Sequence, residues 1–205
     1  LNLSSYLNPK FKFNLTLLAE NFYLNNEYKK VKTVLKQFDK KDEFYYWFRV
    51  KKEAQIIIKE QGYDDGINFI STKFNNISDP NLKMVFDLAN FYKNSKKYEE
   101  AIDYYTQIIS TLDNNSEVKS DILYRRGGSY ERINNYKKAD EDLMQSLEIN
   151  PDDAYVLNYL AYSWLERDYN IDKAFQMLEK AYSLKNNDPY IIDSIGWAYY
   201  LIDNY

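Results

Sequence analysis

Residues 157–184 have the sequence LNYLAYSWLERDYNIDKAFQMLEKAYSL, and this stretch decides the fold. In its first half, apolar and small residues recur at spacings of three and four, at Leu157, Leu160, Ala161 and Trp164. The second half repeats the pattern at Ala174, Met177, Leu178 and Ala181. Apolar residues with this period line one face of an α-helix. The stretch therefore predicts two helices joined by a tight turn, with Ala161 and Ala174 where the two backbones cross.

The same pattern recurs along the chain. Small residues 35, 35, 38, 34 and 35 positions apart stand at Ala19, Ala54, Ala89, Gly127, Ala161 and Gly196. A large residue follows three positions later each time, at Phe22, Ile57, Tyr92, Tyr130, Trp164 and Tyr199. A period near 34 is typical of stacked helical hairpins, because one hairpin cannot bury both of its faces alone. The repeat predicts one solenoid over the whole chain and favours binding over catalysis.

The repeat spacing also sets the predicted boundaries. We expect hairpins at about 12–43, 47–80, 82–119, 120–153 and 154–188, with the end of a preceding second helix at 1–9 and a lone first helix at 189–205. The stretch 112–119 is predicted to be a longer loop between two hairpins rather than a domain boundary. The chain begins with Leu rather than Met, which predicts a piece of a longer protein.

Composition supports this reading and excludes several classes of function. Gly 5 and Pro 4 among 205 residues are too few for a turn-rich β protein, and the hydrophobic content of 45% suffices for a continuous core. The net charge of −4, with acidic and basic residues interleaved, argues against a nucleic-acid partner. Cysteine and histidine are absent, so disulfides, thiolate metal sites and the commonest general base are excluded. We therefore predict no catalytic residue, no metal site and no cofactor.

No apolar stretch reaches the roughly 18 residues that a membrane-spanning helix needs, and no signal peptide opens the chain. Direct membrane insertion is therefore not expected. The absence of cysteine fits a periplasmic and a cytosolic protein equally.

The chain resembles the tetratricopeptide repeat family along essentially its entire length. YEEAIDYYTQII at 98–109 matches the second-helix consensus of that family. LYRRGGSYERINNYKKADEDL (123–143), NPDDAYVLNYLAYSWLERD (150–168) and IIDSIGWAYYL (191–201) resemble alphaproteobacterial repeat proteins, which are often exported. The resemblance implies an all-α, right-handed α-solenoid of tetratricopeptide-type helical hairpins in a bacterial protein, and it slightly favours the periplasm.

Three residues depart from the family pattern. Glu53 and Arg126 occupy a usually apolar first-helix position, so we expect looser packing or an ion pair there. Gly66 replaces the usual Ala. Neighbouring carboxylates such as Asp64 and Asp65 point in different directions on a helix, so we interpret them as a solvated face or helix N-terminus. Gly127 is interpreted as a helix-crossing residue rather than part of an RNA-binding segment.

The predicted binding surface is the concave face, which the resemblance places on first-helix residues that face away from the second helix. Its candidate peptide contacts lie toward the C-terminus and are Tyr124, Arg125, Tyr155, Asn158, Tyr159, Tyr162, Asp193 and Trp197. Gly128 is expected to leave room for a ligand side chain beside Tyr124. The alternative is that the tyrosines only pack against adjacent helices, and for Tyr159 and Tyr162 the two readings weigh equally. A family subclass that grips a peptide carboxylate is rejected, because only two of its five positions fit among Lys51, Gln55, Asp87, Asp121 and Arg125.

The sequence therefore predicts a protein–protein interaction scaffold that binds a peptide or a helix of a partner in its groove. A homo-oligomerisation or spacer module of a larger bacterial envelope protein is the alternative, and the repeat domain of an enzyme is a third. Self-association is expected through the last helix, whose apolar residues have no following helix to cover them: Ile192, Ile195, Trp197 and Tyr199.

Overall fold

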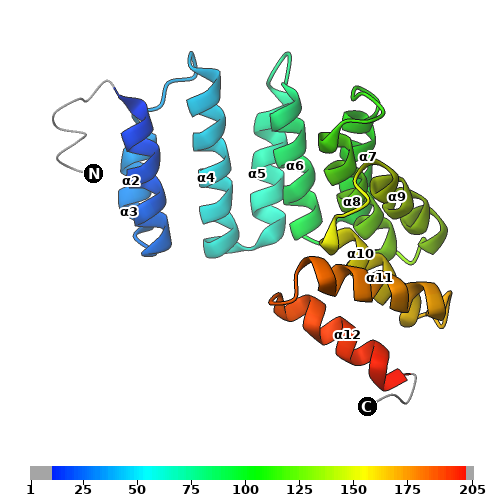
Figure 1. Cartoon of the computed structure of the whole chain (residues 1–205). Coiled ribbons are helices and arrows are strands. Elements are labelled where there is room, and N and C mark those ends of the chain that lie inside the picture. The colour runs from blue at the N-terminus through cyan, green and yellow to red at the C-terminus, as the bar shows by residue number, and fades with distance from the viewer. Residues whose placement is uncertain (1–10, 202–205) are drawn as a thin grey trace. The chain divides into compact units, whose positions relative to one another are not determined.

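The computed structural model describes residues 11–201, and these residues form helices and connecting segments without a strand (Figure 1). The helices are α2 (Lys12–Leu24), α3 (Tyr28–Leu35), α4 (Glu43–Gln61), α5 (Tyr63–Asn75), α6 (Leu82–Asn94), α7 (Tyr98–Ile109), α8 (Glu117–Arg132), α9 (Tyr136–Ile149), α10 (Ala154–Leu165), α11 (Ile171–Leu184) and α12 (Pro189–Leu201). The predicted all-α solenoid of helical hairpins is confirmed as a fold class. The helix end expected at 1–9 lies outside the described residues.

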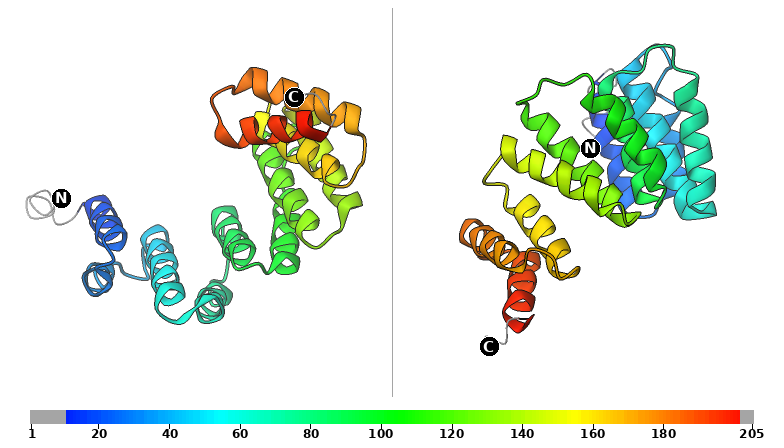
Figure 2. Two further views of the ribbon diagram at one scale, coloured as in Figure 1. Left: turned by 90° about the horizontal axis from the view of Figure 1, so that it is seen from below. Right: turned by 90° about the vertical axis from the view of Figure 1, so that its right-hand side faces the viewer.

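The chain divides into two compact units between Phe91 and Tyr92. In the first, α2 packs on α3 and α4 packs on α5; in the second, α8 packs on α9 and α10 on α11, as Figures 1 and 2 show. Helix α12 packs on both α10 and α11. The arrangement of all hairpins in one continuous array, with the boundaries given above, stays a prediction.

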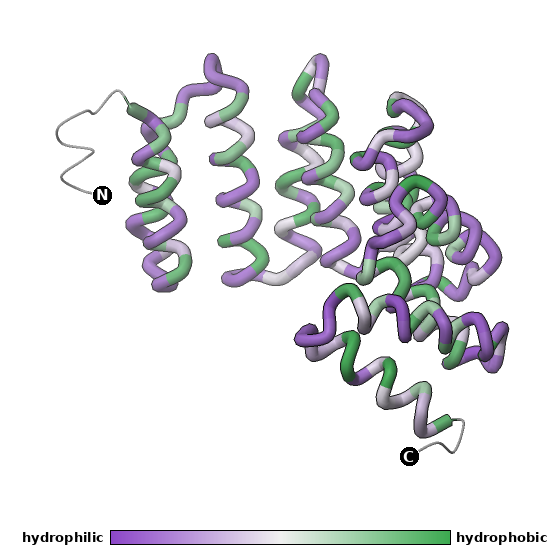
Figure 3. Tube along the Cα trace, in the orientation of Figure 1, coloured by the Kyte–Doolittle hydropathy of each residue, from purple (hydrophilic) through white to green (hydrophobic). Residues whose placement is uncertain are grey.

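Amphipathic helices explain why the hairpins pair. Apolar and polar residues intermix along the helices in Figure 3. The buried apolar residues recur at helical spacing, as Leu157, Leu160, Ala161 and Trp164 do on α10. The core of the second unit joins α9, α10, α11 and α12, with Leu143, Leu160, Trp164, Leu178 and Ile191 each at most 2% exposed. Burying a side chain of this size is worth about 1.5–3 kcal/mol, so the hairpins gain most of their stability from packing on one another.

The small residues lie where helices cross. Ala54, Ala161 and Ala174 are fully buried. A Cβ atom added at Gly127 would lie 2.9 Å from Leu143 Cγ, and one added at Gly66 would overlap the Ile58 side chain. The interpretation of Gly127 as a crossing residue is confirmed. At Gly196, by contrast, an added Cβ would meet nothing within 4 Å.

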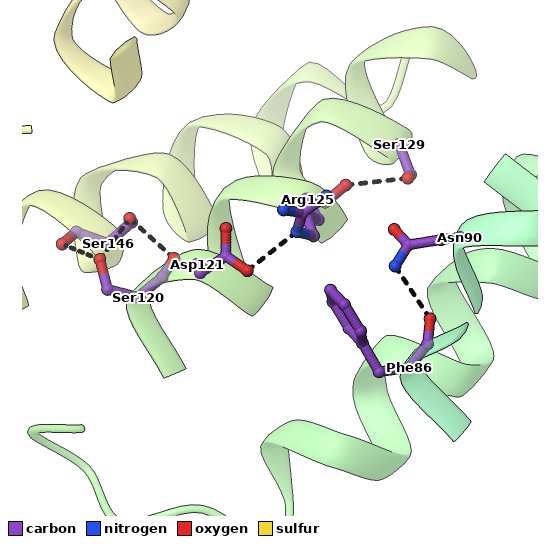
Figure 4. A network of polar contacts seen from close by, with 7 residues as sticks. All are labelled: Phe86, Asn90, Ser120, Asp121, Arg125, Ser129 and Ser146. Atoms are coloured by element: carbon purple, nitrogen blue, oxygen red, sulfur yellow. Dashed lines mark hydrogen bonds and ion pairs between the residues drawn. The ribbon is translucent and has the colours of Figure 1, made fainter. Parts of the chain in front are cut away.

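The two charged residues at apolar positions both form ion pairs, as expected. Arg126 makes two hydrogen bonds to Asp142, from Nε to Oδ2 and from Nη2 to Oδ1, each 2.7 Å long. Glu53 accepts a 2.8 Å hydrogen bond from Arg49 Nε. A second buried polar contact joins α8 to α9, where the hydroxyls of Ser120 and Ser146 lie 2.9 Å apart (Figure 4). Each of these contacts gives a partner to polar groups that would destabilise the fold if they were buried without one.

The segment expected to be a loop at 112–119 is partly helical. Helix α8 begins at Glu117, and the Ser116 hydroxyl accepts a hydrogen bond from the Lys119 amide at the helix N-terminus. The sequence-based boundary was three residues late, because the helix-capping role of Ser116 was not considered.

Turns between first and second helices share a left-handed residue. Asn26, Lys96 and Asn134 have φ values of 58°, 60° and 59°. The two asparagines also accept hydrogen bonds from the tyrosine hydroxyls two residues later, at 2.9 and 2.8 Å. Asparagine tolerates this conformation, whereas lysine adopts it at a cost. Lys96 is therefore strained where the equivalent positions are not.

Candidate functional site

Three neighbouring cavities line one side of α8, α10 and α12 within the second unit. The first and second share Arg132 and Tyr159 in their walls, and the second and third share Tyr162 and Glu166. Because adjacent cavities share wall residues, we treat them as one surface and call it the groove. Its walls come from first helices of successive hairpins, from the turn that precedes α7, and from the first residues of α7 and α9, Tyr98 and Tyr136.

The first cavity is basic and has a volume of about 400 Å³. Its walls are Lys93, Asn94, Lys96, Tyr98, Tyr124, Gly128, Arg132 and Tyr159. Burial lowers the pKa of the Lys93 ammonium, and the positive charges of Arg125 and Arg132 lower it further against the opposing effect of Asp121. Arg132 lies 3.6 Å from Glu131 and keeps a side chain that is 60% exposed. Three cationic side chains thus surround this end of the groove.

The middle cavity, also about 400 Å³, is held by hydrogen bonds. The Tyr159 hydroxyl donates to Glu131 Oε2 at 3.0 Å, and its ring meets Tyr124 edge-on with centroids 5.7 Å apart. Burial and the Glu131 carboxylate raise the pKa of the Tyr159 phenol. Arg167 reaches Asp140 at 2.7 Å. These contacts fix the side chains, so the middle cavity is a preformed surface.

The third cavity, about 790 Å³, combines aromatic rings with carboxylates. Its walls are Tyr162, Glu166, Ile192, Asp193, Gly196, Trp197 and Tyr200. The Trp197 and Tyr200 rings stack with centroids 5.3 Å apart. Tyr162 hydrogen-bonds to Glu166, and burial, Glu166 and Asp193 together raise the pKa of its phenol. Within residues 11–201, neither Glu166 nor Asp193 has an ion-pair partner.

Five of the eight predicted contact residues line the groove. Tyr124 and Tyr159 lie in the basic cavity, and Tyr162, Asp193 and Trp197 lie in the third cavity. Tyr159 is half-buried and held by its partners, whereas Tyr162 and Trp197 are 39% and 38% exposed. Tyr159 thus packs on Tyr124 while it lines two cavities, and Tyr162 is exposed; peptide contact by either tyrosine stays a prediction.

The other three predicted residues lie outside these cavities. Arg125 donates a 2.9 Å hydrogen bond to Asp121 one turn earlier. The Tyr155 hydroxyl donates to Asp188 at 3.1 Å, with the Lys185 ammonium 4.8 Å from its ring. Asn158 Oδ1 is buried without a hydrogen-bond partner in the described part of the chain. Their roles as peptide contacts stay predictions.

Gly128 and Tyr124 line the same cavity, and a Cβ added at Gly128 would make ordinary van der Waals contact with the Tyr159 hydroxyl at 3.5 Å. The room for a ligand side chain beside Tyr124 stays a prediction. One expectation about α12 needs correction. On α12, Ile195 is 8% exposed, and Tyr199 meets Phe175 edge-on at 5.0 Å. Ile192 and Trp197 are exposed as expected, together with Tyr190, Tyr200 and Leu201. The expectation was wrong for Ile195 and Tyr199, because α12 turns their face toward α10 and α11.

Sequence reasoning missed Lys93 and Lys96. Lys93 lies in the last turn of α6 and Lys96 in the turn after it, where a charged residue is interpreted as part of a solvated surface. The signal that would have found them is a departure from the repeat: Lys96 stands at a turn position that Asn occupies at Asn26 and Asn134.

The rejected carboxylate-binding positions are occupied in the structure. Lys51 Nζ lies 2.8 Å from Asp87 Oδ2, and Trp47 Nε1 donates to the same oxygen at 2.9 Å. The Lys51 charge is thus neutralised within the first unit.

Residues 11–201 hold no group of three or more metal-ligating side chains. None of the described helices combines the length and the apolarity that crossing a membrane requires.

Comparison with known sequences identifies the repeat. The family model described as tetratricopeptide repeat matches residues 82–111 and 120–153. These two stretches carry tetratricopeptide repeats. A tetratricopeptide repeat-containing protein of Pseudomonas aeruginosa is 34% identical over 79 residues, which are 38% of this chain and 13% of the relative. One of Methanocaldococcus jannaschii is 35% identical over 92 residues, or 45% of this chain and 15% of the relative. The chain spans a small part of each relative, and the narrower alphaproteobacterial resemblance stays a prediction.

Solved structures share the fold of these tetratricopeptide repeats. MamA matches with a TM-score of 0.58 at 21% identity, covering 74% of this chain and 85% of MamA. The Cut9–Hcn1 tetramer matches with a TM-score of 0.66 at 14% identity, covering 96% of this chain and 38% of that chain. The first repeat domain of RPAP3, solved with an HSP90 peptide bound, matches with a TM-score of 0.53 at 18% identity, covering 60% and 93%. At these identities the likeness shows the fold alone.

Proposed function

We propose that the chain is a non-catalytic scaffold that binds an extended peptide or a helix of a partner protein in the groove. The observation that carries this proposal is the third cavity, where Tyr162, Trp197 and Tyr200 remain exposed beside carboxylates. Aromatic side chains with polar neighbours are typical of protein-binding surfaces, since they bury much area with few rotatable bonds.

The RPAP3 repeat domain supports the proposal, because a domain of the same fold holds a peptide. The fixed positions of the side chains that line the groove are the second support. Two of its cavities are lined by residues whose positions are fixed by ring contacts and hydrogen bonds, so a ligand would not have to order them.

Binding is tested with a peptide selected on the protein from a displayed random library. Tyr162→Ala and Trp197→Ala should each weaken its affinity by about 2 kcal/mol, because each removes a large contact surface at the centre of the cavity. Tyr182→Ala is the matched control, since Tyr182 lies on α11 outside the groove and is 41% exposed. Fluorescence anisotropy measures the affinities, and circular dichroism confirms that the variants stay folded. Unchanged affinity in both groove variants would place binding elsewhere.

Tyr159 needs a milder substitution in this test. Tyr159→Ala would remove a half-buried ring together with its bond to Glu131, so any loss of affinity would mix with a loss of stability. Tyr159→Phe keeps the ring contact with Tyr124 and removes only the hydroxyl.

Self-association through α12 is the second candidate, favoured by the exposed Ile192, Tyr200 and Leu201. Ile192→Lys places a charge on this face, and if the face joins two copies, the variant should sediment as a monomer where the parent protein dimerises. A parent protein that stays monomeric at high concentration contradicts this candidate.

Turnover of any substrate by the chain, abolished by a point change, would contradict the proposed absence of catalysis.

A further inference from the structure

The groove carries opposite charge at its two ends. Lys93, Lys96 and Arg132 surround the first cavity, and Glu166 and Asp193 lie in the third. The middle cavity between them shares Arg132 with the first cavity and Glu166 with the third. Its Arg167 is paired with Asp140, and its Glu131 accepts from Tyr159 and lies 3.6 Å from Arg132. Lys93 and Lys96 on one side and Asp193 on the other are therefore the charges that a partner can best neutralise.

Each end presents its charge to a ligand. Lys96 and Arg132 are exposed and line the first cavity. Lys96 has a strained left-handed backbone conformation, with a φ of 60°. Glu166 and Asp193 are exposed and have no ion-pair partner within residues 11–201. Beside them, Trp197 is stacked on Tyr200 and remains 38% exposed. An exposed aromatic ring attracts the cationic head and the methylene stem of a lysine or arginine.

Resting on the function proposed above, we propose that the groove selects an extended segment of a partner protein with an acidic residue at one end and a basic residue at the other. The acidic residue lies in the Lys93–Lys96–Arg132 cavity. The basic residue lies against Trp197 between Glu166 and Asp193, and apolar residues of the segment cover Tyr159 and Tyr162. Opposite charges at the two ends fix the register of the segment as well as its direction along α8, α10 and α12.

The spacing of the two charges follows from the fold. Arg132 belongs to α8 and Asp193 to α12, with α10 between them. Packed helices lie roughly 8–10 Å apart, and an extended chain advances about 3.3 Å per residue, so two helix spacings correspond to about six residues. A segment with this charge spacing neutralises both ends at once, whereas a segment with two like charges faces repulsion at one end.

The test uses four fluorescent peptides with the same apolar centre and end charges six residues apart: acidic–basic, acidic–acidic, basic–basic and neutral. At low salt the acidic–basic peptide should bind roughly five- to tenfold more tightly than each of the others, as two exposed ion pairs allow. The advantage should shrink as salt rises, because exposed charges are screened.

Charge reversal then exchanges the preference. Glu166→Lys/Asp193→Lys should bind the acidic–acidic peptide best, and Lys96→Glu/Arg132→Glu should bind the basic–basic peptide best. Glu179→Lys on α11 and Lys137→Glu on α9 are the controls, since both residues are exposed and lie outside the groove. Neither control should change the order of the four peptides.

The outcomes distinguish charge selection by the groove from peptide binding as such. If all four peptides bind equally and lose affinity in Trp197→Ala, the groove binds peptides but charge selection is wrong. If only Glu179→Lys or Lys137→Glu changes the order, the charges act elsewhere and the selection by the groove is wrong. If no peptide binds, both this inference and the binding groove are overturned.

Discussion

At the scale of single residues, Lys96 shows a conflict between stability and binding. Its φ of 60° is the conformation that Asn26 and Asn134 adopt in equivalent turns, where each asparagine also accepts a hydrogen bond from a following tyrosine. A lysine held in an unfavourable conformation at the wall of a basic cavity is consistent with a side chain kept for binding.

Lys96→Asn should therefore stabilise the protein by about 0.5–1 kcal/mol, because asparagine adopts the left-handed conformation at lower cost. The same change should weaken the binding of the acidic–basic peptide. Urea denaturation measures the first effect and anisotropy the second, with Lys137→Asn on the surface of α9 as the control. A stability equal to that of the control would show that the turn is not strained.

The Arg126–Asp142 pair is the second residue whose role the structure defines. Both side chains are largely buried, at 16% and 7% exposed, and they share two hydrogen bonds of 2.7 Å. Asp142→Ala should destabilise the fold by about 3 kcal/mol, because it leaves a buried charge unpaired. Replacing both residues, as Arg126→Met/Asp142→Leu, should cost far less in a denaturant melt. A double variant as unstable as the single one would contradict this account.

At the scale of helices, close crossings decide how the hairpins pair. Ala161 and Ala174 are fully buried in the core that joins α10 and α11. Ala161→Leu and Ala174→Leu should each destabilise the protein by roughly 1–3 kcal/mol, because the added atoms force the helices apart. Thermal and urea melts measure the change. Two variants within about 0.5 kcal/mol of the parent would count against the crossing positions assigned here.

At the scale of the whole molecule, the repeats should unfold in parts. Helical hairpins contact mainly their neighbours in sequence, so a loss of packing stays local. Leu160→Ala, which opens a cavity in the core of the second unit, should raise hydrogen exchange in α9 to α12 while exchange in α4 and α5 stays unchanged. Mass spectrometry of exchanged peptides measures this, and equal acceleration in both units would show a single cooperative fold.

The sequence alone determined the fold class and the close crossings at Ala161, Ala174 and Gly127, and it offered an ion pair as one of two expectations at Arg126 and Glu53. These depend on helical periodicity and on side-chain volume, which are local properties of the chain. It also placed Tyr162, Asp193 and Trp197 at a shared surface, because first helices in a repeat present equivalent positions to the same side.

The tertiary structure decided which of those side chains are available. The rotation of α12 buries Ile195 and exposes Tyr200, and the bond from Tyr159 to Glu131 fixes a ring that lines two of the cavities. The basic cavity also emerged only from the structure, since it joins the turn after α6 to α8 and α10. Contacts between residues some 30 positions apart depend on how helices rotate against one another, and that rotation is set by packing rather than by the repeat period.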